Sequence, residues 1–73
     1  MEMEDYENVV VFSTKAIELD ENLGAAFYNR AIANEMLRKE LEACQDWDKA
    51  ADLGIRVAEG YYTTNSCELL IEK

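Results

Sequence analysis

An internal repeat with a period of 34 residues constrains the fold of this 73-residue chain more than any other feature. Shifting the sequence by 34 positions aligns residues 15–19 with 49–53, Lys-Ala-Ile-Glu-Leu on Lys-Ala-Ala-Asp-Leu. The same shift places residues 27–28, Phe-Tyr, on residues 61–62, Tyr-Tyr. Because these matches keep one register along the chain, we expect a recurring structural unit that buries its apolar face only against its neighbours.

The spacing of apolar residues indicates that the unit is helical. The chain has no Pro and only three Gly, a composition that favours helices over turn-rich β structure. Apolar residues spaced three and four apart predict helices at 6–19, 23–38, 40–53 and 56–71. The predicted apolar stripe of the first helix is Val9, Phe12, Ala16 and Leu19. We therefore expect an all-α fold, a single module over residues 1–73 with about four helices in antiparallel succession.

The boundary between the second and third helices rests on charge, because no Gly or Pro marks it. Arg38 and Lys39 are cations of the kind found at a helix C-terminus, and Glu40 and Glu42 are anions of the kind found in a first turn. These residues predict a break near Lys39. A continuous helix over residues 25–53 is the alternative.

The repeated segments resemble the tetratricopeptide repeat, a helix–turn–helix unit of 34 residues. Residues 26–31, Ala-Phe-Tyr-Asn-Arg-Ala, resemble the opening of the first helix of such a repeat, and residues 43–54 resemble its second helix. The resemblance implies one full repeat over 23–53, preceded by a second helix at 6–19. Residues 56–71 then correspond to a following first helix or a capping helix.

Four residues depart from the family pattern. Glu21 stands where the family often has Pro, and Arg38 stands where the turn between the paired helices usually has Gly. Arg30 and Asn34 occupy positions where the family often has Leu and an aromatic residue. We therefore expect Arg30 to lay its aliphatic stem along the helix pair.

The resemblance and the periodicity together predict a core and a binding groove. The expected core residues are Phe12, Ala16, Phe27, Ala31, Ala43, Cys44, Trp47 and Ala50. The groove implied by the resemblance is lined by first-helix residues: Tyr28, Asn29, Ile32, Glu35 and Met36. Their aromatic, amide and thioether groups suit peptide recognition. The alternative is that Ile32 and Met36 pack on a neighbouring helix while Tyr28 and Glu35 are ordinary surface residues.

The residues that usually carry catalysis or bind metals are sparse. The chain has no His, and its two cysteines have neither the number nor the spacing of a disulfide scaffold or a zinc site. We expect Cys44 to be a buried, inert thiol, whereas Cys67 lies near the C-terminus and could be exposed. Asp48 and Asp52 share a helix face, but no base accompanies them. We therefore expect no enzymatic activity, no cofactor and no metal.

The net charge of −9 limits the partners that the module can take. Nucleic acid and anionic membranes need a basic footprint, so we expect neither of them. The expected partner is a protein or peptide, with a basic one favoured by the charge. The alternative function is a structural or self-assembling element, in which the uncovered end helices pair in a homodimer. A cytoplasmic location is expected, because nothing reads as a secretion signal or a membrane span.

Overall fold

Four α-helices make up most of residues 3–70, which are the residues that this computed structural model describes. They are α1 (Met3–Leu19), α2 (Gly24–Met36), α3 (Glu40–Asp52) and α4 (Arg56–Thr64), followed by a short 3-10 helix, η1 (Cys67–Leu69). No strand occurs in the described part of the chain. The all-α prediction is confirmed. Within residues 3–70 no helix is both long and apolar enough to cross a membrane.

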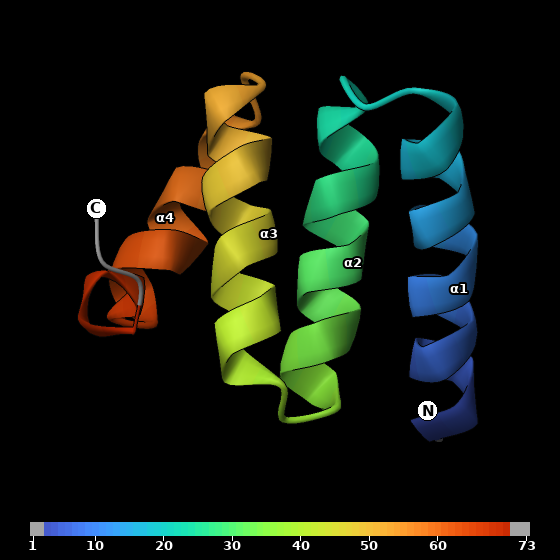
Figure 1. The fold of residues 1–73 in the computed structure, drawn as a ribbon. Coiled ribbons are helices and arrows are strands. Elements are labelled where there is room, and N and C mark those ends of the chain that lie inside the picture. Colours follow the sequence, from blue (N-terminus) through green and yellow to red (C-terminus); the bar gives the residue numbers. More distant parts are fainter. Residues whose placement is uncertain (1–2, 71–73) are drawn as a thin grey trace.

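The helices succeed one another along the chain as neighbours in space. Figure 1 shows α1, α2 and α3 side by side in a row, each antiparallel to the one before it, with α4 tilted against α3. Contacts join α1 to α2, α2 to α3 and α3 to α4. As a result α1 and α4 lie at opposite edges of the row, and α1 has a neighbour on one side only (Figure 1).

The core lies where α2, α3 and α4 meet. Ala31 of α2 and Ala43 and Ala50 of α3 are fully buried, which lets the two backbones approach closely. Trp47 of α3, only 1% exposed, fills the space beside them. Its ring stacks on that of Tyr61 of α4, with centroids 5.3 Å apart and an interplanar angle of 9°. Stacking of this kind adds to the stability gained from burying the apolar area of the two rings.

The turn between α2 and α3 falls where the charge pattern predicts it. The helix ends at Met36 and the next begins at Glu40, so the alternative of one continuous helix is wrong. Arg38 has a φ of +62°, in the left-handed region that usually requires Gly. The amide of Lys39 donates to the carbonyl oxygen of Asn34 at 2.8 Å and closes the turn. Arg38 therefore adopts a backbone conformation that Gly usually supplies, with a side chain that disfavours it.

The fourth helix is shorter than predicted. We expected it over residues 56–71, but it ends at Thr64, and Ile71 lies outside the described residues. Residues 63–66, Thr-Thr-Asn-Ser, are poor helix formers because their side chains compete for backbone hydrogen bonds. Here Asn65 Nδ2 donates to the carbonyl oxygen of Tyr61 at 2.8 Å. Ser66 then takes a left-handed φ of +54° and reverses the chain.

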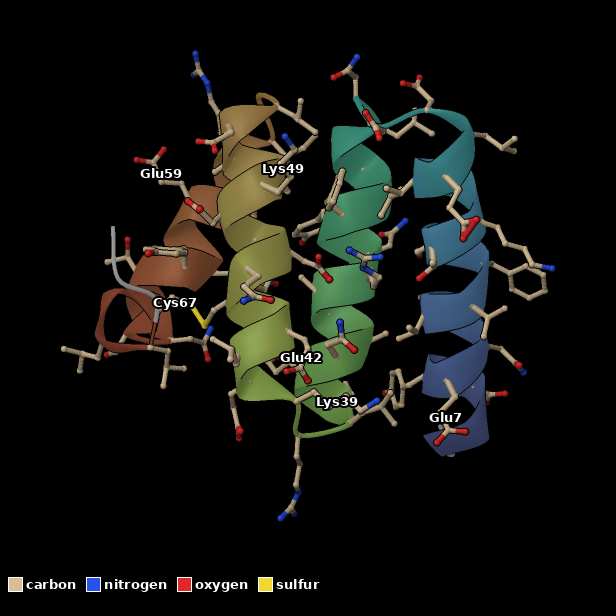
Figure 2. The ribbon with its side chains drawn as sticks, viewed as in Figure 1. Glu7, Lys39, Glu42, Lys49, Glu59 and Cys67 are labelled. Carbon is tan, nitrogen blue, oxygen red and sulfur yellow. A yellow bond between two sulfur atoms is a disulfide. The ribbon has the colours of Figure 1, made fainter. Side chains whose placement is uncertain are left out.

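The two cysteines form a disulfide, which corrects the expectation of separate thiols. The reversal at Ser66 carries Cys67 back to α3, where it bonds to Cys44 with the Cα atoms 5.4 Å apart. Figure 2 shows the sulfur of Cys67 lying against α3. Cys67 is fully buried rather than exposed. Disulfides persist mainly in oxidising surroundings, so this bond does not favour the expected cytoplasmic location.

Two glycines should respond oppositely to the same substitution. Gly54 follows α3 with a φ of +96°, and a Cβ there would meet nothing within 4 Å. Gly54→Ala should therefore destabilise the fold by about 1–2 kcal/mol through backbone strain alone. Gly60 lies inside α4 with equally open space, so Gly60→Ala should stabilise by up to about 1 kcal/mol. Urea unfolding measures both, and equal effects would contradict the assigned backbone conformation.

The disulfide should contribute measurably to stability. Its half-cystines are 23 residues apart, and closing a loop of this length restricts the unfolded chain by about 3 kcal/mol. A phosphine reductant should lower the free energy of unfolding of the wild-type chain by about that amount. The variant Cys44→Ala with Cys67→Ala is the control and should not respond to reductant. Two thiols titrating in the untreated native protein would show that the bond is absent.

Candidate protein-interaction surface

The predicted groove is divided between the two sides of α2. Asn29, which is exposed, and Ile32, which is half-buried, face α1. They line a shallow hollow of about 430 Å³ between α1 and α2. The other lining residues are mostly apolar and come mainly from α1: Tyr6, Val9, Phe12, Ser13 and Ala33. The hollow thus includes Asn29 and Ile32 of the five predicted groove residues. Its other wall is α1, which the prediction did not include.

The other three predicted residues lie elsewhere. Tyr28 faces α4, with its ring centroid 5.8 Å from that of Tyr61. Side-chain hydrogen bonding to Tyr61, and then burial, raise the pKa of Tyr28 above its ordinary value of 10.0. Glu35 borders a small recess of about 50 Å³ beside Trp47. Met36 is 47% exposed at the end of α2. The structure thus does not bring these five residues together on one surface.

An apolar stripe on α1 is exposed rather than buried. Phe12 is 69% exposed and Leu19 is 90% exposed, while Val9 is 38% exposed, so the assignment of Phe12 to the core is corrected. Ala16, also assigned to the core, is half-buried. The side of α1 that meets α2 is one residue further round the helix, with Val10, Ser13, Thr14 and Ile17 all at least half-buried. The predicted stripe is consequently largely exposed, and its residues Val9 and Phe12 border the hollow between α1 and α2.

The remaining predicted core residues lie inside the molecule. Phe27, Ala31, Ala43, Cys44, Trp47 and Ala50 are all less than a tenth exposed and belong to one apolar cluster. Ala58 and Cys67 complete that cluster from the C-terminal side. Trp47 is therefore placed to anchor α4 rather than to contact a ligand.

A polar cluster missed by the sequence analysis links three helices. Arg30 of α2 forms two hydrogen bonds to Asp46 of α3, Nε to Oδ2 at 2.8 Å and Nη2 to Oδ1 at 2.7 Å. Asn34 Nδ2 also donates to Asp46 Oδ2 at 3.2 Å, and Arg30 Nη1 donates to Thr14 Oγ1 of α1 at 3.2 Å. Hydrogen bonding to Asp46 raises the pKa of Arg30 above its ordinary value. The guanidinium therefore stays charged.

Arg30 also contacts an aromatic side chain through its guanidinium group. Its guanidinium carbon lies 5.5 Å from the centre of the Phe27 ring, close enough for a cation–π contact. Arg30 thus forms an ion pair with Asp46 and a cation–π contact with Phe27. The expectation about its aliphatic stem included neither interaction.

A second hollow, of about 270 Å³, lies over this polar cluster. Lys39 and Glu42, labelled in Figure 2 at the turn between α2 and α3, border it together with Gln45. The Asp46 carboxylate inside it already accepts three hydrogen bonds from Arg30 and Asn34. A carboxylate held in this way fixes the positions of the helices that carry its partners. Among the described residues no group of three or more acidic, Cys or His side chains could hold a metal.

Neither a family model nor a curated protein nor a solved structure matches the chain significantly.

Removing the carboxylate from the polar cluster should destabilise the fold. Asp46→Ala leaves the partly buried Arg30 charge and the buried Asn34 amide without their acceptor. We expect a loss of about 2–4 kcal/mol in the free energy of unfolding. Asp52→Ala, on the exposed side of the same helix, is the matched control and should change it by less than about 0.5 kcal/mol. Equal losses from the two changes would mean that the cluster contributes nothing specific.

Proposed function

We propose that this chain is a non-catalytic protein-interaction module of the tetratricopeptide-repeat type, which docks an amphipathic helix or peptide along α1. The observation that carries the proposal is the exposed apolar stripe of α1, with Phe12 69% and Leu19 90% exposed. The stripe is continuous with the hollow between α1 and α2 through Val9 and Phe12. An apolar surface gathered on one side of a helix is typical of a binding site.

The fold supports the assignment to this type of repeat. Helices alternate in direction, and the turn at Arg38 and Lys39 separates a pair that fits the 34-residue register of the sequence. In a repeat array each unit buries its apolar face against the next one. Within this chain α2 covers α3 in that way, whereas no described residue covers the equivalent stripe of α1. A partner helix on α1 would complete the same packing.

The chemistry of the partner follows from the surface. The stripe requires apolar side chains at helical spacing on the partner. Contacts that bury Phe12 against those side chains would anchor the complex. The net charge of −9 favours a basic flank and speeds its association. Asn29, exposed at the rim of the hollow, carries an amide that can both donate to and accept from a peptide backbone.

Binding should depend on Phe12 and on the charge of the ligand. The probe is a fluorescent helical peptide with Leu on one face and Lys on the other, compared with a version carrying Glu in place of Lys. The Lys peptide should bind at least about tenfold more tightly, and added salt should weaken its binding. Anisotropy titration measures the affinity of each peptide.

Two variants identify the surface that the peptide uses. Phe12→Glu should weaken binding of the Lys peptide by about tenfold or more, since it places a charge in the stripe. Leu69→Glu is the matched control, because Leu69 is 82% exposed on the opposite end of the molecule, and it should bind as the wild type does. An unchanged affinity in Phe12→Glu would overturn the proposed docking site.

A further inference from the structure

The outer face of α4 is also uncovered by any described residue. Val57 is 54% exposed and Tyr61 is 36% exposed. Together with Gly60 and Thr64, which are also exposed, they form a shallow, mainly apolar hollow of about 230 Å³ on the surface of α4. Tyr61 reaches inward to Trp47 with one ring face, so it links this hollow to the core.

The 34-residue register relates this face to one that is covered. Subtracting 34 from Tyr61 and Thr64 gives Phe27 and Arg30, residues of α2 that face α3. Adding 34 to Phe12 gives Asp46, the residue of α3 that binds Arg30. The outer face of α4 therefore corresponds to the side of α2 that meets α3, and the stripe of α1 corresponds to the side of α3 that meets α2. Within one chain these two faces cannot meet, because they lie at opposite edges of the row (Figure 1).

We propose that α4 of one copy docks antiparallel on the α1 stripe of a second copy, so that copies of this chain associate head to tail. This inference rests on the proposed function, because it takes the α1 stripe to be a helix-docking surface. In the new interface the position of the Arg30–Asp46 pair is occupied by Thr64 and Phe12. A neutral residue opposite an aromatic one leaves no charge buried without a partner.

The charges of the two helices are compatible with this pairing. In α4 the only charged residues are Arg56 and Glu59, so this helix is neutral in a chain whose net charge is −9. Antiparallel docking brings Arg56, at the start of α4, beside the C-terminal end of α1. Glu18 and Asp20 are exposed there. α4 itself therefore adds no net negative charge against the acidic α1, and Arg56 makes one favourable contact at the rim.

The geometry sets the form and strength of the assembly. Docking one face on a different face is heterologous, and the two faces lie at opposite edges, so the assembly lengthens instead of closing as a symmetric dimer. A single pair of helices buries less than the area of about 1,200 Å² at which stable complexes begin, so the association is weak and reversible. Added salt strengthens it by screening repulsion between the acidic copies.

The first test measures mass against concentration. Light scattering of the wild-type chain should give 8.4 kDa when dilute and a mass that rises past twice that value as the concentration reaches the millimolar range. A mass of 8.4 kDa at every concentration and salt would overturn the proposal. A plateau at twice this mass would also overturn it, because a symmetric dimer does not lengthen.

The second test uses two variants that block one face each. Phe12→Glu removes the stripe and Val57→Glu removes the α4 face, and both residues are exposed enough for the fold to tolerate the change. Circular dichroism checks that each variant is folded. Each alone should remain a monomer, with an association constant lowered at least about tenfold. An equimolar mixture should form a 1:1 heterodimer and stop there, because each partner has one intact face and the outer ends are blocked.

The outcomes separate this inference from the proposed function. If Val57→Glu still self-associates, the stripe pairs with itself and the head-to-tail proposal is wrong. If the mixture stays monomeric while Val57→Glu binds the Lys peptide, the proposed function stands and self-association is overturned. If neither Val57→Glu nor the wild type binds the peptide and no assembly forms, both are overturned.

Discussion

The close approach of α2 and α3 sets the position of the other helices. Ala31, Ala43 and Ala50 have no exposed surface, and their small side chains bring the two backbones together. Trp47 emerges beside this contact and offers its ring face to Tyr61, which places α4. The start of α2 also lies close to the turn after α3. A Cβ on Gly24 would come within 2.8 Å of Ile55 Cγ1 in that turn, so only a residue without a side chain fits there. α1 then attaches to the far side of α2.

The Arg30–Asp46 pair adds register to this contact rather than much net stability. Two fully satisfied hydrogen bonds of fixed geometry allow only one alignment of α2 along α3. Removing either partner leaves a desolvated charge, although replacing the whole cluster by well-packed apolar residues can be neutral or stabilising. The third contact, to Thr14, extends the alignment to α1. A polar cluster at the centre of three helices thus specifies how they are arranged, in a chain with few large apolar side chains in its core.

Much of this fold could be predicted from the sequence. The helices follow from apolar spacing and from the absence of Pro, and the charges of Arg38 to Glu42 correctly predict the break between α2 and α3. The buried face of α1 could not be predicted in this way, because residues 9–12 are apolar all round the helix. Only the position of α2 decides that Val10 faces inward and that Phe12 faces outward.

The candidate site was harder to predict, for similar reasons. Asn29 and Ile32 were expected in a groove and do line a hollow, but its other wall is a helix chosen by packing. The pairing of Arg30 with Asp46 joins residues 16 apart, which requires the antiparallel register of two helices. One sequence signal indicates this pairing: Arg30 is a cation at a position where the resembled family often has Leu. The disulfide depends on the reversal at Ser66, which two cysteines 23 residues apart do not indicate.

The bond between Cys44 and Cys67 encloses the turn that joins α3 to α4 in a covalent ring. Gly54 lies in that turn and is exposed, the kind of position where proteases cut folded chains. A cut there breaks the backbone but not the molecule, because α4 remains tethered to α3 through sulfur and stays stacked on Trp47. The nicked protein would separate into two pieces only after reduction. The fold is thus held together by two independent links at the point where a helical hairpin is usually held by one.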